Sequence, residues 1–481
     1  MSRKTLVLGL LAGLLWGAMA LPALAATPAW RVSQLTTAPM QPYYVGVSGD
    51  RIVWQDIAPS VRKLWTWKMG SSPFMVLEQY MWYAPKVSGD RLAWIATGGS
   101  QPFRVYTWKA GDSTVTVVTS STTGIPDDMQ LSGDRLVWQV DYHSVVTWRV
   151  GDAHVTTLNV GPHQGAAARI SGDRVVWCQS DGSRYQIATW KSGDALSSLV
   201  TNDLHSHDDP VVSGDRMAWL SETGDGDEWA LYTKIASETV PTTVAVNPNA
   251  FPGTTVVSGD RLAWLQEPEG GGVNQVFTWR VGDTAPTQIS AGTAVQTYMD
   301  LSDGRVVWID GPRVMTWAEG AAAASVIATG TSPWGTSIDA DRVAWIDGSH
   351  VMTAVLRSTT ALTKPAVPSG TLRHGKKYSF ASVLSPRIAS LVAGTNTVLN
   401  LYHSETKTVI KKVHGKNTKV KVTYWHLRIT VRMTGVGTGA TVKLTAKTTL
   451  KYAGKWRAIA VYSGGRGFFG STSAPKDFKL K

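Results

Sequence analysis

A seven-residue pattern recurs eight times in the first three quarters of the chain. Six copies read Ser-Gly-Asp-Arg, two apolar residues and Trp, and two divergent copies read SDGRVVW and DADRVAW. The steps between successive Arg residues of the pattern are 40, 44, 39, 42, 45, 44 and 37 residues. Such a period is typical of a four-stranded propeller blade. The copies end at Trp54, Trp94, Trp138, Trp177, Trp219, Trp264, Trp308 and Trp345.

A second motif, Thr-Trp followed by Lys or Arg, lies 12 to 18 residues after the Arg of most copies. A Gly-Asp pair often follows it, as at Gly111-Asp112. Glycine accepts the positive φ angle that a tight hairpin needs, so both Gly-Asp positions predict turns between strands. Each repeat therefore predicts four antiparallel strands. The repeat region is predicted to be all-β, an eight-bladed β-propeller.

The strand that carries the repeat Trp is apolar on both faces. Ile52 and Trp54 lie on one face and Val53 on the other. Blades of a propeller stack face to face, so both faces of this strand should be buried. Burial of one such Trp contributes a few kcal/mol, at about 25 cal/mol per Å². We interpret the periodic Trp, Gly and Asp residues as packing and turn residues rather than catalytic ones.

The eighth repeat ends soon after its third strand, near residues 351–356. A short β-patterned segment, Ala29 to Ser33, precedes the first repeat. We predict that this N-terminal strand completes the last blade and closes the ring, which would leave no open sheet edge.

The repeats resemble the TolB-like propeller repeats of secreted and surface-layer proteins, whose units carry a similar turn followed by an I-V-W strand. The resemblance covers roughly residues 40–356. It implies a propeller fold and little about function, because propellers include binders, scaffolds and enzymes.

The N-terminus is typical of a secretory signal. Arg3 and Lys4 precede an apolar run from Leu6 to Ala20, and Ala23-Leu24-Ala25 offers a small-x-small cleavage site. The apolar run is shorter than the ~20 residues that a spanning helix needs. We predict a signal peptide at residues 1–25 and a secreted, cell-surface-associated protein without a membrane span after cleavage. The single cysteine, Cys178, excludes an intrachain disulfide and a cysteine-based zinc or iron–sulfur site.

Charge divides the chain into two parts. Residues 364–481 contain 22 Lys and Arg but only Glu405 and Asp477, a net charge of +20, whereas the remainder carries 25 basic and 33 acidic residues, a net charge of −8. We predict a propeller over residues 26–363, a linker over 364–370 and a basic β-sandwich over 371–481. The segments 378–386 and 452–457 of the sandwich resemble the Ig-like modules of secreted actinobacterial proteins, which implies a spacer or adhesive role.

The basic residues of the sandwich cluster on predicted strands. One interpretation is a solvated face that keeps the domain soluble. The other is salt-sensitive docking to an anionic polymer of the cell envelope, because this charge creates a long-range attractive field. Export makes nucleic acid an improbable partner. The candidate docking residues are Lys411, Lys412, Lys416, Lys419 and Lys421.

Candidate ligand-binding residues of the propeller stand where each blade's first strand begins. Aromatic rings and carboxylates around a central funnel would suit a sugar, while the alternative is that the rings only pack the funnel rim. These candidates are Tyr43, Trp82, Asp127, His163, Asp208, Tyr298 and Trp334.

A weaker candidate is a metal site in the fifth repeat. His205 and His207 precede a strand, and the next loop of that repeat carries Asp225 and Asp227. Imidazoles with carboxylates would suit a transition metal, and the carboxylates alone would suit calcium. The alternative is an ordinary polar loop, and we expect no resident cofactor otherwise.

The sequence offers no recognised nucleophile motif, because Gly-x-Ser-x-Gly and phosphate-loop patterns are absent. We therefore expect a non-catalytic binding or scaffold protein of the cell envelope, with a propeller face for a glycan or protein. One alternative is an extracellular metal-dependent polysaccharide lyase or hydrolase on a TolB-like propeller, with His163, His205 and His207 near the metal. Another is a hub that binds proteins.

Overall fold

The computed structural model describes residues 28–37, 40–57, 61–81, 83–97, 103–119, 124–159, 164–223, 228–246, 249–250, 254–267, 272–358, 361–385, 397–413, 416–436, 442–462 and 471–481. These residues form strands and turns, with no helix among them. The described residues therefore contain no helix that is long and apolar enough to cross a membrane. The predicted signal peptide lies outside the described residues. The chain divides into two compact units, one formed by Trp30–Leu356 and one that contains Arg357–Lys481.

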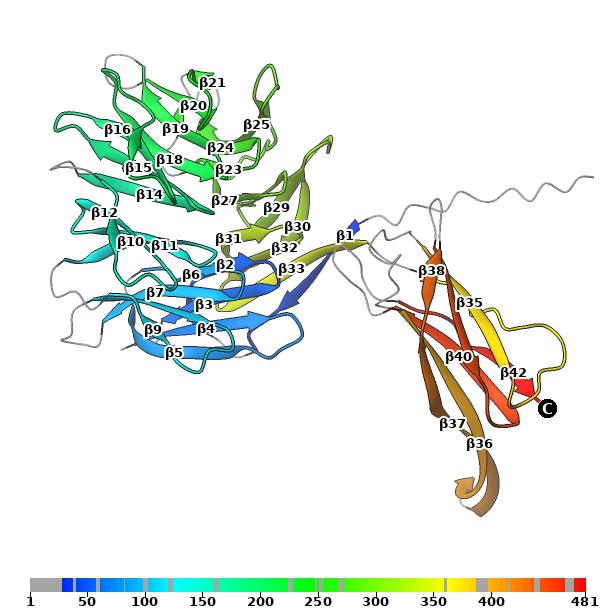
Figure 1. Ribbon diagram of the computed structural model, residues 1–481. Helices are drawn as coiled ribbons and strands as arrows, with labels where there is room; N and C mark the ends of the chain where they lie inside the picture. Colours follow the sequence, from blue (N-terminus) through cyan, green and yellow to red (C-terminus); the bar gives the residue numbers. More distant parts are fainter. Residues whose placement is uncertain are drawn as a thin grey trace, which may run out of the picture. The chain divides into compact units, whose positions relative to one another are not determined.

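The first unit is built from consecutive antiparallel sheets that follow the repeats (Figure 1). The sheets of the first two repeats are joined into one by a short pairing of Tyr80 and Met81 with Thr97 and Ala96. Blade 1 contains β2 (Pro42–Ser48), β3 (Arg51–Ile57), β4 (Arg62–Lys68) and β5 (Phe74–Met81). Blade 2 contains β6 (Lys86–Ser88), β7 (Arg91–Thr97), β8 (Arg104–Lys109) and β9 (Thr116–Val117). Blade 3 contains β10 (Pro126–Ser132), β11 (Arg135–Val140), β12 (Ser144–Arg149) and β13 (Thr156–Thr157). Blade 4 contains β14 (Gly165–Ser171), β15 (Arg174–Ser180), β16 (Tyr185–Lys191) and β17 (Ser198–Leu199).

The second half of the propeller repeats the same plan. Blade 5 contains β18 (His207–Ser213), β19 (Arg216–Glu222), β20 (Trp229–Ile235) and β21 (Thr242–Val246). Blade 6 contains β22 (Asn249–Ala250), β23 (Val256–Ser258), β24 (Arg261–Glu267), β25 (Gln275–Arg280) and β26 (Thr287–Gln288). Blade 7 contains β27 (Gln296–Ser302), β28 (Arg305–Asp310), β29 (Arg313–Ala318) and β30 (Ser325–Thr329). Blade 8 contains β31 (Pro333–Asp339), β32 (Arg342–Asp347), β33 (His350–Ser358) and β1 (Pro28–Gln34).

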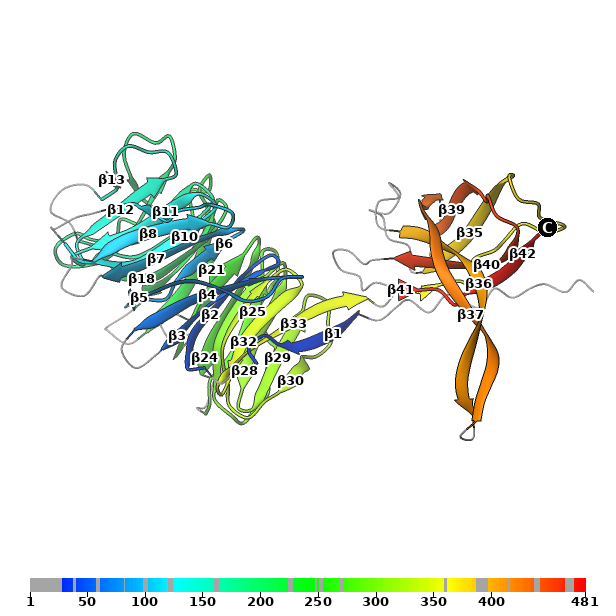
Figure 2. The ribbon, with the colours of Figure 1, turned by 90° about the horizontal axis from the view of Figure 1, so that it is seen from below.

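The N-terminal strand closes the ring, as the sequence predicts. β1 pairs with β33, so the last blade contains strands from both ends of the propeller (Figures 1 and 2). The amide of Leu35 donates to the carbonyl of Val351 at 2.8 Å just beyond the strand. The first strands of successive blades contact one another around the ring, and β31 of blade 8 contacts β2 of blade 1. The predicted fold class, an eight-bladed propeller followed by a basic sandwich, is confirmed.

The repeat Trp residues form the core of every blade. All eight are at most 1% exposed, and the strand around each is buried on both faces. In four blades the Trp ring stacks on the aromatic ring opposite it on the third strand, as Trp54 stacks on Trp65 with their centroids 6.2 Å apart. The interpretation of these residues as packing residues agrees with this burial.

The Ser-Gly-Asp-Arg tetrapeptide links each blade to its neighbour. The Ser48 hydroxyl accepts the amide hydrogen of Gly89 in the next blade at 2.9 Å. Gly89 has a φ of +56°, which a residue with a Cβ atom rarely adopts. Equivalent Ser-to-amide bonds join the later blades up to blade 8. The motif residues therefore form hydrogen bonds between blades in addition to the turn within each blade.

The second unit is a sandwich of two antiparallel sheets. One sheet contains β34 (Ala361–Leu362), β35 (Lys377–Ser385), β39 (Val442–Thr449) and β38 (Thr434–Val436). The other contains β37 (Lys416–Arg432), β36 (Thr397–Val413), β40 (Gly454–Tyr462), β41 (Ser471–Thr472) and β42 (Lys476–Leu480). Phe380, Leu444, Leu401 and Trp456 belong to the single buried core between the two sheets.

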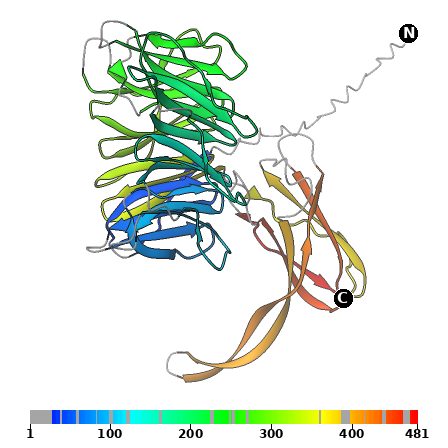
Figure 3. The same cartoon turned by 60° about the vertical axis from the view of Figure 1, so that its left-hand side comes forward.

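Strands β36 and β37 extend beyond the sandwich as a two-stranded ribbon, seen clearly in Figure 3. β40 pairs with β36 only from Thr397 to His403. From Ser404 to Val413, β36 pairs with β37 alone among the described strands. We call residues 404–425 the basic ribbon. Ten residues of extended strand span about 30 Å.

The segment at residues 364–370, where the sequence suggests a linker, lies between two strands of the sandwich sheet. β34 precedes it and pairs with β35. Ala366 forms an isolated bridge with Ala381, and the buried Leu362 belongs to the sandwich core. The sandwich thus begins before the shift in charge composition. The sequence did not indicate this boundary, because the first short strand, β34, contains no charged residue.

Candidate functional site

The described ligand candidates of the propeller lie on the first strands of five different blades. Tyr43, Asp127, Asp208, Tyr298 and Trp334 occupy β2, β10, β18, β27 and β31. Trp82 and His163 lie outside the described residues. The first strands of successive blades contact one another around the ring, so these five positions lie on strands that surround the same central region.

Most of these strands carry a bulge near their beginning. The register shifts between Asp127 and Gln130 in β10, and at the corresponding place in β14, β18, β27 and β31. One residue of each bulge has a positive φ of 39° to 63°, and these residues are Asp128, Ala167, Asp209, Tyr298 and Gly335. A bulge turns a side chain away from the regular alternation, and a positive φ at a residue other than glycine is costly. The same backbone conformation therefore recurs at the bulge of the first strand in five blades.

Three aromatic candidates meet in one exposed cluster, which we call the aromatic cluster. The ring of Trp334 lies 6.2 Å from that of Tyr43 and 6.2 Å from that of Tyr298. Tyr43 is 54% exposed and Tyr298 is 51% exposed. The Arg62 guanidinium lies over the Tyr43 ring, 5.5 Å from its centroid. Exposed rings beside a cation form a surface on which a sugar ring could stack.

The two acidic candidates lie in other blades and bind their own bulges. Asp127 Oδ1 accepts the amide hydrogen of Asp128 at 2.6 Å. Asp208 Oδ1 accepts the amide hydrogen of Asp209 at 2.8 Å, and the thiol of Cys178 approaches it at 3.5 Å. Both carboxylates therefore have a structural role whatever else they bind.

Sequence reasoning missed a set of charged residues farther along the same strands. Arg169 Nη1 donates to Asp128 Oδ2 at 2.7 Å, which joins blades 3 and 4. The Lys86 ammonium lies 5.9 Å from the centroid of the Tyr44 ring. Burial raises the pKa of Asp300 to about 6, against the opposing effect of its hydrogen bonds from backbone amides. The only available signal was their position within the inner strands, where charge is unexpected.

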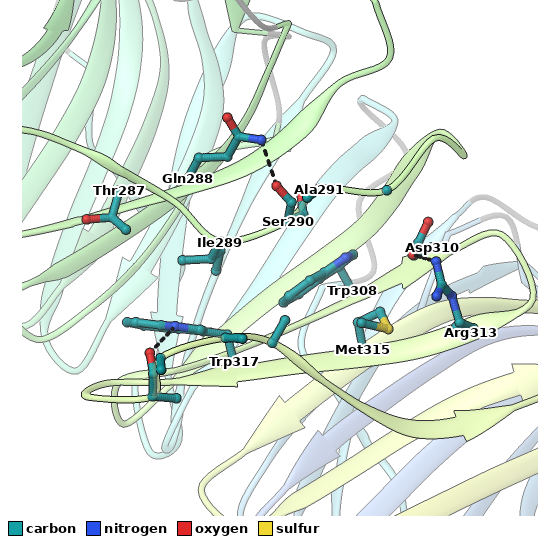
Figure 4. A pocket seen from close by; sticks show the side chains of 15 residues that line it. Thr287, Gln288, Ile289, Ser290, Ala291, Trp308, Asp310, Arg313, Met315 and Trp317 are labelled. Carbon is teal, nitrogen blue, oxygen red and sulfur yellow. Dashed lines mark hydrogen bonds and ion pairs between the residues drawn. The ribbon is translucent and has the colours of Figure 1, made fainter.

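Blades 3, 5 and 7 each contain a cavity beside the repeat Trp, at the end where the blade-to-blade loop enters. The largest, in blade 7, has a volume of about 430 Å³ and is drawn in Figure 4. Trp308 and Trp317 line it on one side and the Gln288–Ala291 segment on the other. Arg313 pairs with the buried Asp310, which also accepts a hydrogen bond from Gln296 at 2.9 Å. The negative charge of Asp310 is therefore balanced by Arg313, which lines the same cavity.

The corresponding cavity in blade 3 is apolar. Its volume is about 190 Å³, and Trp138, Val140 and Val146 line it. Val140 takes the place of Asp310, because both stand two residues after the repeat Trp. The repeat thus preserves the position of the cavity and varies its chemistry.

The blade 5 cavity contains the described part of the predicted metal site. It has a volume of about 250 Å³, and Asp203, His205, His207 and Glu222 are among its lining residues. His207 is 2% exposed, and its Nε2 lies 3.0 Å from Asp203 Oδ1. Burial lowers the pKa of His207, although the nearby Asp203 opposes this. Burial would raise the pKa of Asp203, but the hydrogen bonds from His205 and His207 hold it below its usual value.

Within the described residues, no three His, Cys, Asp or Glu side chains come together in an arrangement that could hold a metal ion. His205 and His207 are therefore brought to one cavity without forming a ligand set by themselves. Asp225 and Asp227 lie outside the described residues, so the full predicted set stays a prediction.

The five docking lysines all fall on the basic ribbon. Lys419 and Lys421 are exposed, and Lys411, Lys412 and Lys416 occupy backbone positions near the tip. The ribbon sequence contains six lysines and one carboxylate, Glu405. Glu405 lies 3.2 Å from His426 and 3.4 Å from Lys407.

No protein family model and no curated protein matches the chain. Solved structures similar to it include a puromycin-hydrolyzing peptidase of Mycobacterium tuberculosis, with 15% identity over 75% of this chain and 61% of that chain and a TM-score of 0.46. The propeller domain of the trilobed protease from Pyrococcus furiosus shares 10% identity over 61% of this chain and 97% of its own, with a TM-score of 0.44. A putative TolB from Agrobacterium tumefaciens shares 15% identity over 51% and 94%, with a TM-score of 0.33.

The chain spans about three fifths of the length of the peptidase. At these identities and TM-scores the similarities carry no functional argument. The propeller assignment rests on the strand pairings of this chain itself.

Proposed function

We propose that this protein is an exported binding protein of the cell envelope. The basic ribbon docks to an anionic envelope polymer, and the propeller presents a ligand face. The observation that carries the proposal is the ribbon: six lysines and one carboxylate lie on a hairpin that extends beyond its sandwich. Among the described strands, none pairs with either outer edge of this ribbon. A hairpin of this kind with so high a positive charge has little packing role and a strong field for anions.

The ligand side of the proposal is a glycan bound at the aromatic cluster. Tyr43, Tyr298 and Trp334 come from blades 1, 7 and 8 and present two half-exposed rings beside a third. The proposal includes kinship with TolB-like propellers and with Ig-like adhesive modules, in keeping with the repeat sequence and the two-sheet sandwich.

Polymer binding is tested with the full mature chain and inorganic polyphosphate, with polygalacturonate as a carboxylate polymer. We expect binding at 0.05 M salt that weakens at least tenfold at 0.5 M salt, because ion pairs with a polyanion release counterions. The double variant Lys419→Glu/Lys421→Glu should lose most of this binding. The matched control, Lys376→Glu/Lys377→Glu, makes the same charge change at exposed residues of the sandwich outside the ribbon.

Equal losses in both variants would show that net charge, not the ribbon, attracts the polymer. Binding that persisted at 0.5 M salt would contradict an electrostatic dock.

Glycan binding is tested by saturation-transfer NMR against a set of neutral and acidic oligosaccharides. Trp334→Ala should abolish transfer to a bound sugar. Tyr142→Ala, which removes a 61% exposed ring outside the aromatic cluster, should leave it unchanged. If a sugar bound equally well to the Trp334→Ala and Tyr142→Ala variants, its binding site would lie outside the aromatic cluster.

A further inference from the structure

The blade 5 cavity differs from its two counterparts because its negative charge has no internal cation. In blade 7 the acidic residue Asp310 is paired with Arg313, and the blade 3 cavity has Val140 at that position. The described residues that line the blade 5 cavity include Asp203 and Glu222 but no Lys or Arg. Two carboxylates without a nearby cation favour a positively charged occupant.

One wall of the cavity is aromatic. Tyr232 lines it and stacks on the buried Trp219, with the ring centroids 6.3 Å apart and the planes 18° apart. This stacking fixes the Tyr232 ring, which remains half-buried. A fixed aromatic face beside carboxylates is a good environment for an organic cation.

A buried imidazole with an unpartnered ring nitrogen belongs to the wall of the same cavity. His207 lines the cavity, and its Nε2 is engaged by Asp203 at 3.0 Å. A carboxylate at Nε2 holds the proton on that nitrogen, which leaves Nδ1 as a bare acceptor. Nδ1 is buried and has no hydrogen-bond partner among the described residues. A buried acceptor of this kind costs free energy until an N–H or O–H donor reaches it.

We infer that the blade 5 cavity binds a ligand that carries a protonated primary amine on a body about the size of one sugar ring. The ammonium group donates hydrogen bonds to Glu222 and Asp203, the imidazole of His207 lies in the same wall, and the carbon skeleton of the ligand packs on Tyr232. A volume of about 250 Å³ is larger than a bare ion needs and suits a monosaccharide-sized molecule. The described residues also form no three-ligand metal set.

This inference goes beyond the proposed function, because the blade 5 cavity is a second site whose lining residues do not include the aromatic cluster. An amino sugar of an envelope glycan has the chemistry that this cavity would take. The inference does not depend on the basic ribbon. The two can therefore fail separately.

The test is calorimetric titration of the full mature chain with glucosamine, glucose and N-acetylglucosamine at pH 6.5. We expect glucosamine to bind at least tenfold more tightly than the two neutral sugars, since only it carries the ammonium group. Glu222→Gln and Asp203→Asn should each weaken glucosamine binding about tenfold. The control Glu78→Gln removes an exposed carboxylate of blade 1, which does not line the cavity, and should leave binding unchanged.

Melting temperatures of the variants confirm that each is folded. Equal affinity for glucosamine and glucose, or no glucosamine binding in the folded wild-type protein, would overturn the inference. Calcium and manganese are titrated alone in parallel. Stoichiometric metal binding that His207→Ala removes would assign the cavity to a metal instead. If glucosamine does not bind but polyphosphate binding is still salt-sensitive, the inference about the cavity is wrong and the proposal for the basic ribbon is unaffected.

Discussion

Arg51 of the first blade donates from Nη2 to Asp90 Oδ1 of the second blade at 2.8 Å. Arg51 is 5% exposed, and its Nη1 also contacts Thr66 of its own blade at 3.1 Å. The same Arg-to-Asp pair joins blade 2 to blade 3, and so on through blade 5 to blade 6. At the next junction Glu319 replaces the aspartate as the partner of Arg261. The repeated tetrapeptide is thus a chain of ion pairs between blades.

Removing one carboxylate of this chain should destabilise the propeller. We expect Asp90→Asn to cost about 1–2 kcal/mol and to lower the melting temperature by about 1–3 °C, because Arg51 would stay buried without its counter-charge. Asp50→Asn is the matched control, since Asp50 holds the same motif position but its ion pair is with Lys68 at 3.7 Å. Calorimetry measures both, and an equal effect of the two changes would show that the blade-to-blade pair contributes nothing.

The closing strand should stabilise the ring through one aromatic ring in particular. The eighth blade has Ala354 where the third strands of six other blades have Trp, and the ring centroid of Trp30 in β1 lies 5.5 Å from the guanidinium carbon of Arg305. We expect a variant without residues 26–37 to melt about 5–10 °C lower, because it opens a sheet edge and exposes that guanidinium. Trp30→Ala should give part of this loss and Trp30→Phe less. Unchanged melting of the shortened chain would contradict closure by β1.

The pH dependence of stability should show a feature from Asp300. The folded-state pKa of this carboxyl is raised to about 6, mainly by burial, above its unfolded value of about 4. A raised pKa contributes stability that is full below pH 4 and lost as pH rises to 6. We expect the melting temperature to fall by about 2–4 °C over this window relative to Asp300→Asn. Parallel pH profiles of the two proteins would refute the shift.

The carboxylates of the ion-pair chain act in the opposite direction. Hydrogen bonds from Arg51, Arg91 and Arg174 lower the pKa of their aspartate partners. That contribution is present above pH 4 and is lost as pH falls below it. The two effects therefore occupy separate pH ranges in the same melting profile.

The single thiol should be unreactive in the folded protein. Cys178 is 1% exposed, and burial, with the nearby Asp208, raises its pKa well above the usual value. Only the thiolate attacks disulfide reagents. We expect labelling by Ellman's reagent to be at least a hundredfold slower in the native protein than in 6 M guanidinium. Rapid labelling without denaturant would show that blade 4 opens locally.

The repeat sequence contained most of the information about the propeller. A period near 42 residues, the Gly-containing turns and the apolar Trp strands are local features, and each blade contains the four strands that they predict, with the first strand of blade 6 split into two short ones, β22 and β23. The pairing of β1 with β33 followed from counting strands. The two-sheet sandwich followed from β alternation, although its first strand, β34, lacks any charge signal.

Tertiary structure alone decided how the candidate residues combine. Tyr43 and Trp334 are neighbours only because the ring closes, and no local pattern relates residues so far apart in the chain. The blade 5 cavity is lined both by Asp203, in the loop between blades 4 and 5, and by Glu222, at the end of β19, and neither residue belongs to the repeated motif. Lysine spacing predicted charged strands, but the basic ribbon exists because β40 stops pairing at His403. Local sequence determines strands and turns, whereas long-range pairing determines which side chains share a site.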